Sequence, residues 1–301
     1  MSLIGIESVT YGVEDLTRAG KFFADFGLSA LERGTHGATF GTPDGTTVAL
    51  RAADDLSLPA AMEPGPAVRE ITWGIDSQAS LDALAADLAT DRPVVTDADG
   101  TAHTVDPAGY GIAFRVTRRT PVELEPQTLN TIGRALRLNA RARIYERAMP
   151  QHIGHIVLYA PGLQRAVDFY RKRLGFMVSD TLKDFGAFLR CSTDHHNLFL
   201  LRHGRTGLNH LSFGVRDLDE IMGGFTMLSK EGWEPAWGLG RHYIGSNLSY
   251  YFRNPGGGYV EYYADMDCIA DPDAWQPGEF SPAQPEALFA WGGYPPKDFG
   301  K

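Results

Sequence analysis

Apolar and polar residues follow a pattern along the chain in which a strand period gives way to a helix period and then to strand periods again. Residues 4–13 alternate as a half-buried strand does. A short amphipathic helix is expected after Asp15, because apolar residues recur at helical spacing up to Phe26, and Gly27 ends it. Further strands are expected over residues 38–40 and 46–50. This pattern predicts a module of one strand, one helix and a strand meander.

The same order of elements recurs in the next segment. We expect a strand over residues 70–75, an alanine-rich helix over residues 80–90 and a hairpin over residues 101–116. The two modules together would form one domain. Residues 118–150 depart from the pattern and are read as an interdomain connection, in which the basic stretch 134–147 can be helical. Its arginines are expected on a solvated helix face or against the acidic remainder of the chain, not at an anion site.

The second half of the chain repeats the first half residue by residue. Leu16–Ala19 matches Leu163–Ala166, Thr72–Ile75 matches Ser212–Val215, and Asp106-Pro107 matches Asn254-Pro255. The sequence therefore predicts an α+β protein with four βαβββ modules paired into two domains. We expect an N-terminal domain at 1–117, a connection at 118–150, a C-terminal domain at 151–265 and a tail at 266–301. The tail is rich in proline and aromatic residues, so it is expected to pack on the body or on a neighbouring subunit.

Composition and charge narrow the class of protein. With 301 residues, 43% hydrophobic and 22% charged, the chain is long enough for two globular domains. A net charge of −9 and a pI near 5.5 argue against nucleic acid or an anionic membrane as partner. No segment has the pattern of a signal peptide or a membrane span, so a cytoplasmic protein is expected. The two cysteines, Cys191 and Cys268, are not spaced as a disulfide framework or a thiolate metal site.

Candidate chemistry begins with Glu261, an acidic residue inside an apolar strand. A buried carboxylate without a partner costs several kcal/mol, so a metal or a cation is expected beside it. His155 and His210 each open a strand-like stretch and are the candidate partners. Two imidazoles and one carboxylate from three strands are typical of a non-haem iron(II) site, and zinc or manganese can use the same set. The alternative is that the histidines are satisfied core residues and Glu261 is a salt-bridged strand residue.

The repeat favours the metal site. In the alignment of the two halves, His155, His210 and Glu261 match Ser8, Glu70 and Ala113. Core histidines would have no reason to occupy these matched positions in one half only. We therefore expect a metal in the C-terminal domain and none in the N-terminal domain.

The residues around Glu261 resemble the type I extradiol ring-cleaving dioxygenases of the vicinal oxygen chelate superfamily. The resemblance covers essentially the whole chain and is carried by His242, Tyr251, the turn Pro255–Gly257 and Glu261 at the family's spacing. It implies the vicinal oxygen chelate fold, with each domain an incomplete barrel. It also implies iron(II), with manganese(II) possible, bound by His155, His210 and Glu261. The implied reaction is cleavage of a catechol by O2 to a muconic semialdehyde-type product, in a homo-oligomer.

The same resemblance assigns roles to three further residues. The equivalent of Tyr251 hydrogen-bonds the deprotonated substrate oxygen, and the equivalent of His242 supports that oxygen. In the pair His195-His196, the second histidine matches the acid/base of the family. A one-residue difference in loop length would make His195 the acid/base in place of His196. The alternative interpretation is that both histidines are exposed loop residues. In an extended segment His195 would point away from the metal.

The substrate and the competing functions follow from the remaining residues. An arginine that would bind a carboxylated catechol is absent before His242, and Arg241, which adjoins His242, can face away. An uncharged aryl- or alkyl-substituted catechol is therefore expected, with Trp237 and Phe185 as wall residues. The same fold also serves glyoxalase-like metal-dependent isomerases and antibiotic-sequestering binding proteins. Neither of these explains His196, His242 and Tyr251 together.

Overall fold

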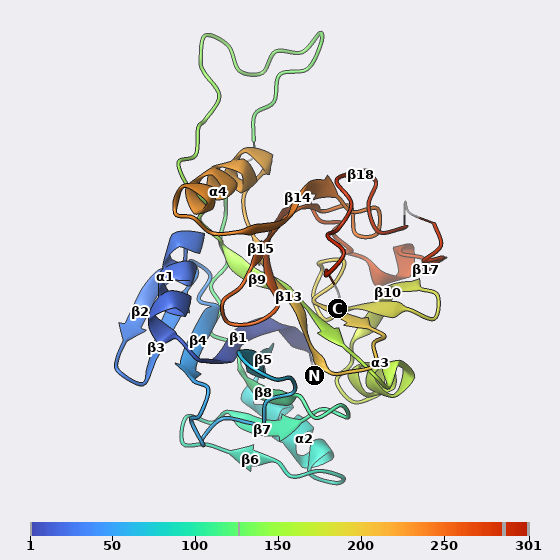
Figure 1. The fold of residues 1–301 in the computed structure, drawn as a ribbon. Helices are drawn as coiled ribbons and strands as arrows, with labels where there is room; N and C mark the ends of the chain where they lie inside the picture. The colour runs from blue at the N-terminus through green and yellow to red at the C-terminus, as the bar shows by residue number, and fades with distance from the viewer. Residues whose placement is uncertain (1, 126, 285–286, 300–301) are drawn as a thin grey trace.

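The computed structural model describes residues 2–125, 127–284 and 287–299. Small parts of the predicted connection and tail, at 126, 285–286 and 300–301, lie outside these residues. The described strands form two mixed sheets of eight and ten strands with few helices, and the first strand of each module lies at the centre of a sheet (Figure 1). This arrangement confirms the predicted α+β class and the four βαβββ modules.

The first half of the chain forms the eight-stranded sheet. Its elements are β1 (Leu3–Val13), α1 (Leu16–Phe26), β2 (Ser29–Arg33), β3 (Gly37–Gly41), β4 (Thr47–Ala52), β5 (Ala67–Ile75), α2 (Gln78–Leu88), β6 (Val95–Thr96), β7 (Ala102–Val105) and β8 (Gly111–Val116). The strand order is β2-β3-β4-β1-β5-β8-β7-β6. The two modules join through the antiparallel pair of β1 and β5.

The second half repeats this arrangement. Its elements are β9 (His152–Tyr159), α3 (Leu163–Lys172), β10 (Met177–Leu182), β11 (Gly186–Arg190), β12 (Leu198–Leu201), β13 (Gly207–Gly214), α4 (Leu218–Lys230), β14 (Pro235–Arg241), β15 (Leu248–Arg253) and β16 (Tyr259–Ala264). The tail adds the 3-10 helix η1 (Pro272–Ala274) and the strands β17 (Gly278–Phe280) and β18 (Trp291–Gly292). The strand order is β17-β10-β11-β12-β9-β13-β16-β15-β14-β18.

Helix α1 shows how the sequence fixes a local element. The Asp15 side chain caps its first turn by accepting a hydrogen bond from the Arg18 backbone N–H. Gly27 ends it in the left-handed conformation, with φ of 112°, which glycine adopts without a steric penalty. Phe22, Phe23 and other apolar residues of one face are buried, which stabilises the helix against the sheet. The predicted start and end of this helix are confirmed.

The strand register confirms the repeat and its matched positions. In the first half Ser8 pairs with Thr72, and Thr72 pairs with Ala113. In the second half Ser212 pairs with both His155 and Glu261. Ser8 and Ala113 therefore occupy the places of His155 and Glu261 in their own sheet.

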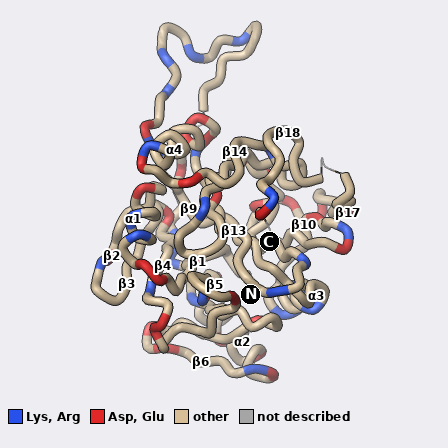
Figure 2. The backbone as a smooth tube through the Cα atoms, in the orientation of Figure 1, with Lys and Arg blue, Asp and Glu red and all other residues tan. Residues whose placement is uncertain are grey.

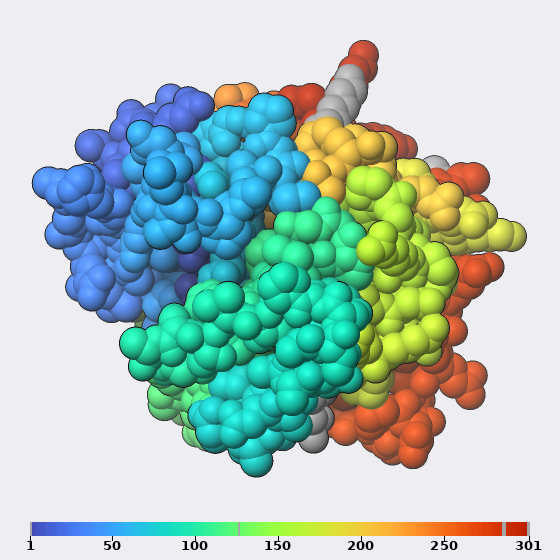
Figure 3. Space-filling model, turned by 90° about the horizontal axis from the view of Figure 1, so that it is seen from below, coloured from blue at the N-terminus to red at the C-terminus, as the bar shows by residue number. Residues whose placement is uncertain are grey.

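The two halves pack directly against each other. Phe26 of α1 stacks on Tyr262 of β16 with ring centroids 4.0 Å apart, and the Tyr262 hydroxyl donates to the Phe26 carbonyl at 2.6 Å. The Tyr110 hydroxyl donates to the Tyr159 carbonyl at 2.8 Å. Figure 3 shows the blue-to-green first half in close contact with the yellow-to-red second half. Buried aromatic contacts of this kind join the sheets into one body.

Two expectations about local structure are wrong. His155 and His210 do not open their strands, since each lies in the middle, at the fourth position of β9 and of β13. Both strands begin earlier because their preceding residues continue the ladder between β9 and β13. The basic stretch 134–147 forms no helix and runs as an extended loop beyond α4 (Figure 1). Its apolar residues lack a helical stripe that could pack on the body.

The tail packs on the body of its own chain. Strand β17 pairs with β10, and β18 pairs with β14. The Trp275 indole donates to the Ser179 carbonyl at 2.8 Å. These contacts confirm the first of the two placements expected for the tail. In the described residues, no helix is both long and apolar enough to cross a membrane.

Candidate metal centre and its cavity

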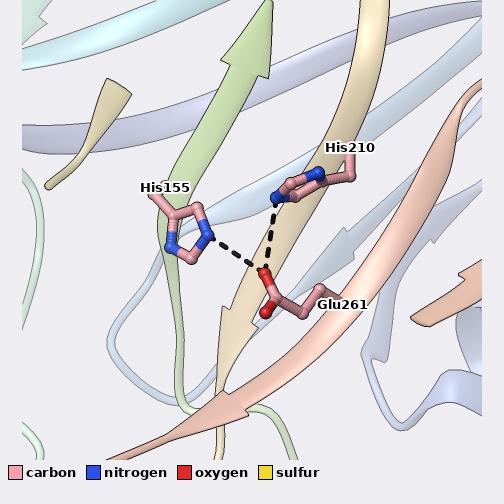
Figure 4. Close-up of side chains that lie close together, drawn as sticks. All are labelled: His155, His210 and Glu261. Atoms are coloured by element: carbon pink, nitrogen blue, oxygen red, sulfur yellow. Dashed lines mark ion pairs between the residues drawn. The ribbon is translucent and has the colours of Figure 1, made fainter. Parts of the chain in front are cut away.

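Three ligand-type side chains converge from neighbouring strands of the second sheet (Figure 4). Nε2 of His155 on β9 lies 3.0 Å from Oε2 of Glu261 on β16, and Nε2 of His210 on β13 lies 3.5 Å from the same oxygen. One ligand atom of each residue lies within 4.8 Å of the others, and all three residues are buried. The three candidate metal residues are thus brought together.

The two distances to the Glu261 oxygen, 3.0 and 3.5 Å, are close to the spacing of ligand atoms around a bound metal ion. Metal–ligand bonds of about 2.1 Å place neighbouring ligand atoms roughly 3.0–3.4 Å apart. Burial lowers the pKa of His210 to about 3, so its imidazole is neutral and keeps a lone pair for a metal. Burial raises the pKa of Glu261, but the hydrogen bond from His155 and the electrostatic influence of the surrounding imidazoles outweigh it and lower the pKa to about 2. The glutamate is therefore a carboxylate at neutral pH.

Hydrogen bonds from neighbouring residues hold the carboxylate of Glu261. The Ser212 hydroxyl donates to Oε2, and the Asn247 amide donates to Oε1 at 3.3 Å. Ser212 is the residue opposite Glu261 in the ladder between β13 and β16. Such contacts around a ligand fix its orientation.

His242 and Tyr251 form a hydrogen-bonded pair beside this cluster. His242 Nδ1 lies 2.6 Å from the Leu288 carbonyl and donates to it, so the neutral ring has Nε2 as its acceptor. The Tyr251 hydroxyl, 2.7 Å away, donates to that Nε2. Burial lowers the pKa of His242, and burial with the charge of Glu261 raises the pKa of Tyr251, so both groups are neutral at pH 7.

His195 and His196 are both buried, which contradicts their reading as exposed loop histidines. His196 lines the cavity, and its ring lies 4.3 Å from that of His155 between centroids. His195 lies behind it, with Nδ1 3.1 Å from His196 Nδ1 and Nε2 2.9 Å from Asp180 Oδ2. They are buried because His195 has a carboxylate partner and the tail residue Trp275 covers its ring, at 5.5 Å between centroids.

These side chains face a cavity of about 300 Å³ with mostly apolar walls. Residues from β9, β11, β12 and the loop before β15 form one wall: Val157, Phe188, Phe199, Leu201 and Ile244. Phe185 and Trp237 also line it, as expected from the sequence. Arg241 does not, because its guanidinium binds Asp265 at 2.8 Å and the Ser246 carbonyl.

The tail completes the cavity, which sequence reasoning did not anticipate. Phe299 stacks on Tyr259 at 4.7 Å and contacts the Tyr251 ring at 5.2 Å between centroids. Leu288 adds a wall as well as the carbonyl that holds His242. The sequence signalled only that the aromatic tail should pack somewhere. Asp180 was also missed, and an acidic residue in the apolar strand β10 was its only signal.

In the first half, the positions that match the three candidate metal ligands carry a different set of side chains. Glu70, which matches His210, accepts a hydrogen bond from His103 Nδ1 at 2.9 Å. Asp97 holds Nε2 of the same histidine at 3.0 Å. Within the described residues, the group around Glu261 is the one set of three such side chains close enough to share a metal.

Residues 152–262 match the Glyoxalase/Bleomycin resistance protein/Dioxygenase superfamily. This stretch of the chain is a domain of that superfamily. All three candidate metal residues lie within it.

Proteins similar to this chain include one named as a metapyrocatechase and one named as a glyoxalase. Metapyrocatechase 2 from Cupriavidus necator is 34% identical over 197 residues, which cover 64% of this chain and 61% of that protein. The match thus spans less than two thirds of that relative. The Mn(II)-bound glyoxalase from Novosphingobium aromaticivorans has a TM-score of 0.78 and 29% identity, covering 98% of this chain and 93% of its own.

A third comparison concerns the fold alone. Homoprotocatechuate 2,3-dioxygenase from Arthrobacter globiformis has a TM-score of 0.78 at 18% identity, covering 97% of this chain and 89% of its own. The two halves of this chain therefore share the fold of that dioxygenase.

Proposed function

We propose that the protein cleaves a catechol beside its two hydroxyls, using a divalent metal and O2, to a muconic semialdehyde-type product. The observation that carries this proposal is the position of His196, His242 and Tyr251 around one cavity with the ligand cluster of Glu261. A ring cleavage needs a base for the substrate, polar groups for its oxygens and an apolar space for its ring. The 34% identity to a metapyrocatechase supports the same reaction.

His155, His210 and Glu261 would hold the metal, which we propose to be iron(II), with manganese(II) as the other candidate. When bound, the metal supplies a Lewis acid and a template for the two catechol hydroxyls. The ligand set does not choose between these ions, because both accept imidazole and carboxylate. Glu261 contributes one negative charge, which leaves a net positive centre for a deprotonated catechol.

His196 is proposed as the base that takes a catechol proton. Its Nδ1 is engaged with His195, so Nε2 remains to face the cavity. Burial and the neighbouring histidines lower its pKa, which keeps the ring neutral and able to accept a proton at pH 7. Tyr251 and His242 lie beside Glu261, with His242 Nε2 3.9 Å from Oε1, and would orient the substrate oxygen.

The substrate we propose is an uncharged catechol with an alkyl or aryl substituent. Val157, Phe188, Phe199 and Ile244 offer no charge to a substituent, and their burial of apolar surface contributes roughly 25 cal/mol per Å². A carboxylate in this part of the cavity would lose its hydration without gaining a partner. Among the described residues that line the cavity, Arg202 is the one arginine or lysine, and it is exposed at the rim.

A glyoxalase-like isomerase is the second candidate, because the manganese-bound glyoxalase matches nearly the whole chain. The two activities differ in their need for O2. The metal-loaded protein should be given a panel of substituted catechols in an oxygen electrode, and a thiohemiacetal in an isomerase assay without oxygen. Oxygen uptake that starts with a catechol supports the proposal. Isomerase turnover with no catechol-dependent uptake would replace it by the second candidate.

We further propose that the chain divides as its repeat indicates. Residues 1–117 would be a metal-free domain, 118–150 a connection, 151–265 the catalytic domain and 266–301 a tail that closes its cavity. Ser8 and Ala113 lack metal-ligating side chains of the required type, and Glu70 is engaged by His103. The first domain would therefore act by packing against the catalytic domain.

A further inference from the structure

The segment 127–144, here called the arm, stands away from the rest of the molecule. Figure 1 shows it as a green loop that projects beyond α4. Its ends are anchored on α4, where Gln127 donates to Asp219 at 2.8 Å and the adjacent Tyr145 donates to Asp217 at 3.1 Å. Between these anchors its hydrogen bonds run within the arm, such as the two between Asn130 and Arg137 at 2.7 and 3.1 Å. The arm thus has a shape of its own.

The arm exposes large apolar side chains in unusual number. Five of them face solvent with relative exposures from 53% to 107%: Leu129, Ile132, Leu136, Leu138 and Ile144. Single exposed apolar residues are normal on a protein surface, but a cluster on one projecting segment marks an interaction site. Burying even one such side chain is worth about 1.5–3 kcal/mol.

The charge of the arm is opposite to that of the remainder of the chain. Residues 127–144 contain four arginines and no acidic residue, whereas the whole chain carries −9. Figure 2 shows blue segments along the arm, whereas red and blue segments alternate over α4 and the body. An acidic surface would therefore attract the arm, and a nucleic acid or an anionic membrane would be repelled by the rest of the protein.

We propose that the arm docks on the body of a second copy of this chain. A second copy is always present together with the arm, and its body carries the net negative charge that would attract the arm. The apolar side chains would provide the affinity, and Arg134 and Arg141 would favour the encounter. Because the arm emerges from α4 and contributes nothing to the catechol cavity, this contact assembles the protein and leaves the chemistry to each chain.

The test is the mass of the full-length, metal-loaded protein in solution. Light scattering behind size exclusion at micromolar concentration should give a dimer or larger assembly for the native chain. The triple variant Ile132→Ser/Leu138→Ser/Ile144→Ser should run as a monomer, since each change removes an exposed apolar side chain without disturbing the core. Leu56→Ser is the matched control, because Leu56 is 99% exposed outside the arm. It should assemble as the native chain does.

A second variant tests the role of charge and avoids the loss of apolar residues. Arg134→Gln/Arg141→Gln should raise the concentration for half-assembly about tenfold or more at low salt, and the native chain should dissociate as salt rises. Circular dichroism and metal content would show that each variant is folded. A monomeric native chain would overturn the proposal, as would a triple variant that assembles like the native chain. Binding to nucleic acid or anionic vesicles in place of self-association would also overturn it.

Discussion

The arrangement of Asp180, His195 and His196 yields the sharpest prediction about the proposed acid/base. His195 Nε2–H donates to Asp180, so its Nδ1 carries a lone pair and accepts Nδ1–H of His196. This chain of two hydrogen bonds leaves Nε2 of His196 as the basic atom in the cavity. If His195 is removed, the imidazole of His196 can rotate or change its protonated nitrogen.

The expected loss of turnover for each substitution depends on the position of the residue in the row of hydrogen bonds from Asp180 through His195 to His196. His196→Gln removes the proposed base and should lower kcat by roughly 10²- to 10⁴-fold. His195→Gln removes the buried hydrogen bond that orients His196, worth about 1–3 kcal/mol, which corresponds to roughly 5- to 150-fold in kcat. We therefore expect His195 to influence turnover through His196, because the structure buries it against that residue. KM and metal content should change little in both variants.

The assay compares kcat, KM and metal content for the native chain, both variants and His36→Gln, which replaces an exposed histidine. The expected order of kcat is native and His36→Gln, then His195→Gln, then His196→Gln. Native turnover in His195→Gln would refute the positioning role of His195. Full activity in His196→Gln would leave the proposed mechanism without its proton carrier, and loss of metal in either variant would show that the ligands were assigned wrongly.

Three further predictions concern other parts of the molecule. Glu261→Ala should lose nearly all of the one metal ion expected per chain while Glu70→Gln keeps it, as metal analysis would show, and a second bound ion would contradict a metal-free first domain. Phe299→Ala should raise KM roughly tenfold in steady-state kinetics, since a lost apolar contact is worth about 1–3 kcal/mol, and an unchanged KM would remove the tail from the substrate site. The hydrogen bonds of His103 with Glu70 and Asp97 raise its pKa to about 9, so its stabilising effect is complete below pH 6.5 and is lost as pH rises through 9. The melting temperature of His103→Gln should therefore fall less between pH 6.5 and 9 than that of the native chain. An equal fall in both proteins would contradict this.

The fold was accessible from the sequence because it repeats a local pattern, and the ligand cluster was accessible because the repeat shows that its residues occur in one half only. The periods of apolar residues located α1 and the hairpin of β15 and β16, and the internal repeat aligned Ser8 with His155 as the strand register does. A register error of one residue would have turned these side chains to the opposite face of the sheet. Pattern and register therefore agree on the face that carries the cluster.

Contacts between segments far apart in the chain could not be foreseen in this way. Phe299 reaches the cavity after a tail of irregular structure, and the Leu288 carbonyl that holds His242 has no side-chain signal. The basic arm was expected to be helical because arginine, alanine and leucine favour helices. The arm has no apolar stripe at helical spacing that could pack on the body of its own chain, and helix propensity alone does not stabilise a short helix.

The central claim, oxygen-dependent cleavage of a catechol, is tested most directly by the product formed under isotopically labelled dioxygen. The metal-loaded protein should be mixed with a substituted catechol under ¹⁸O₂, and the product should be analysed at once by mass spectrometry. The account predicts a ring-opened product that keeps every carbon of the catechol and has gained both atoms of one O2 molecule. A product without label, or an oxidised catechol whose ring is intact, would contradict it.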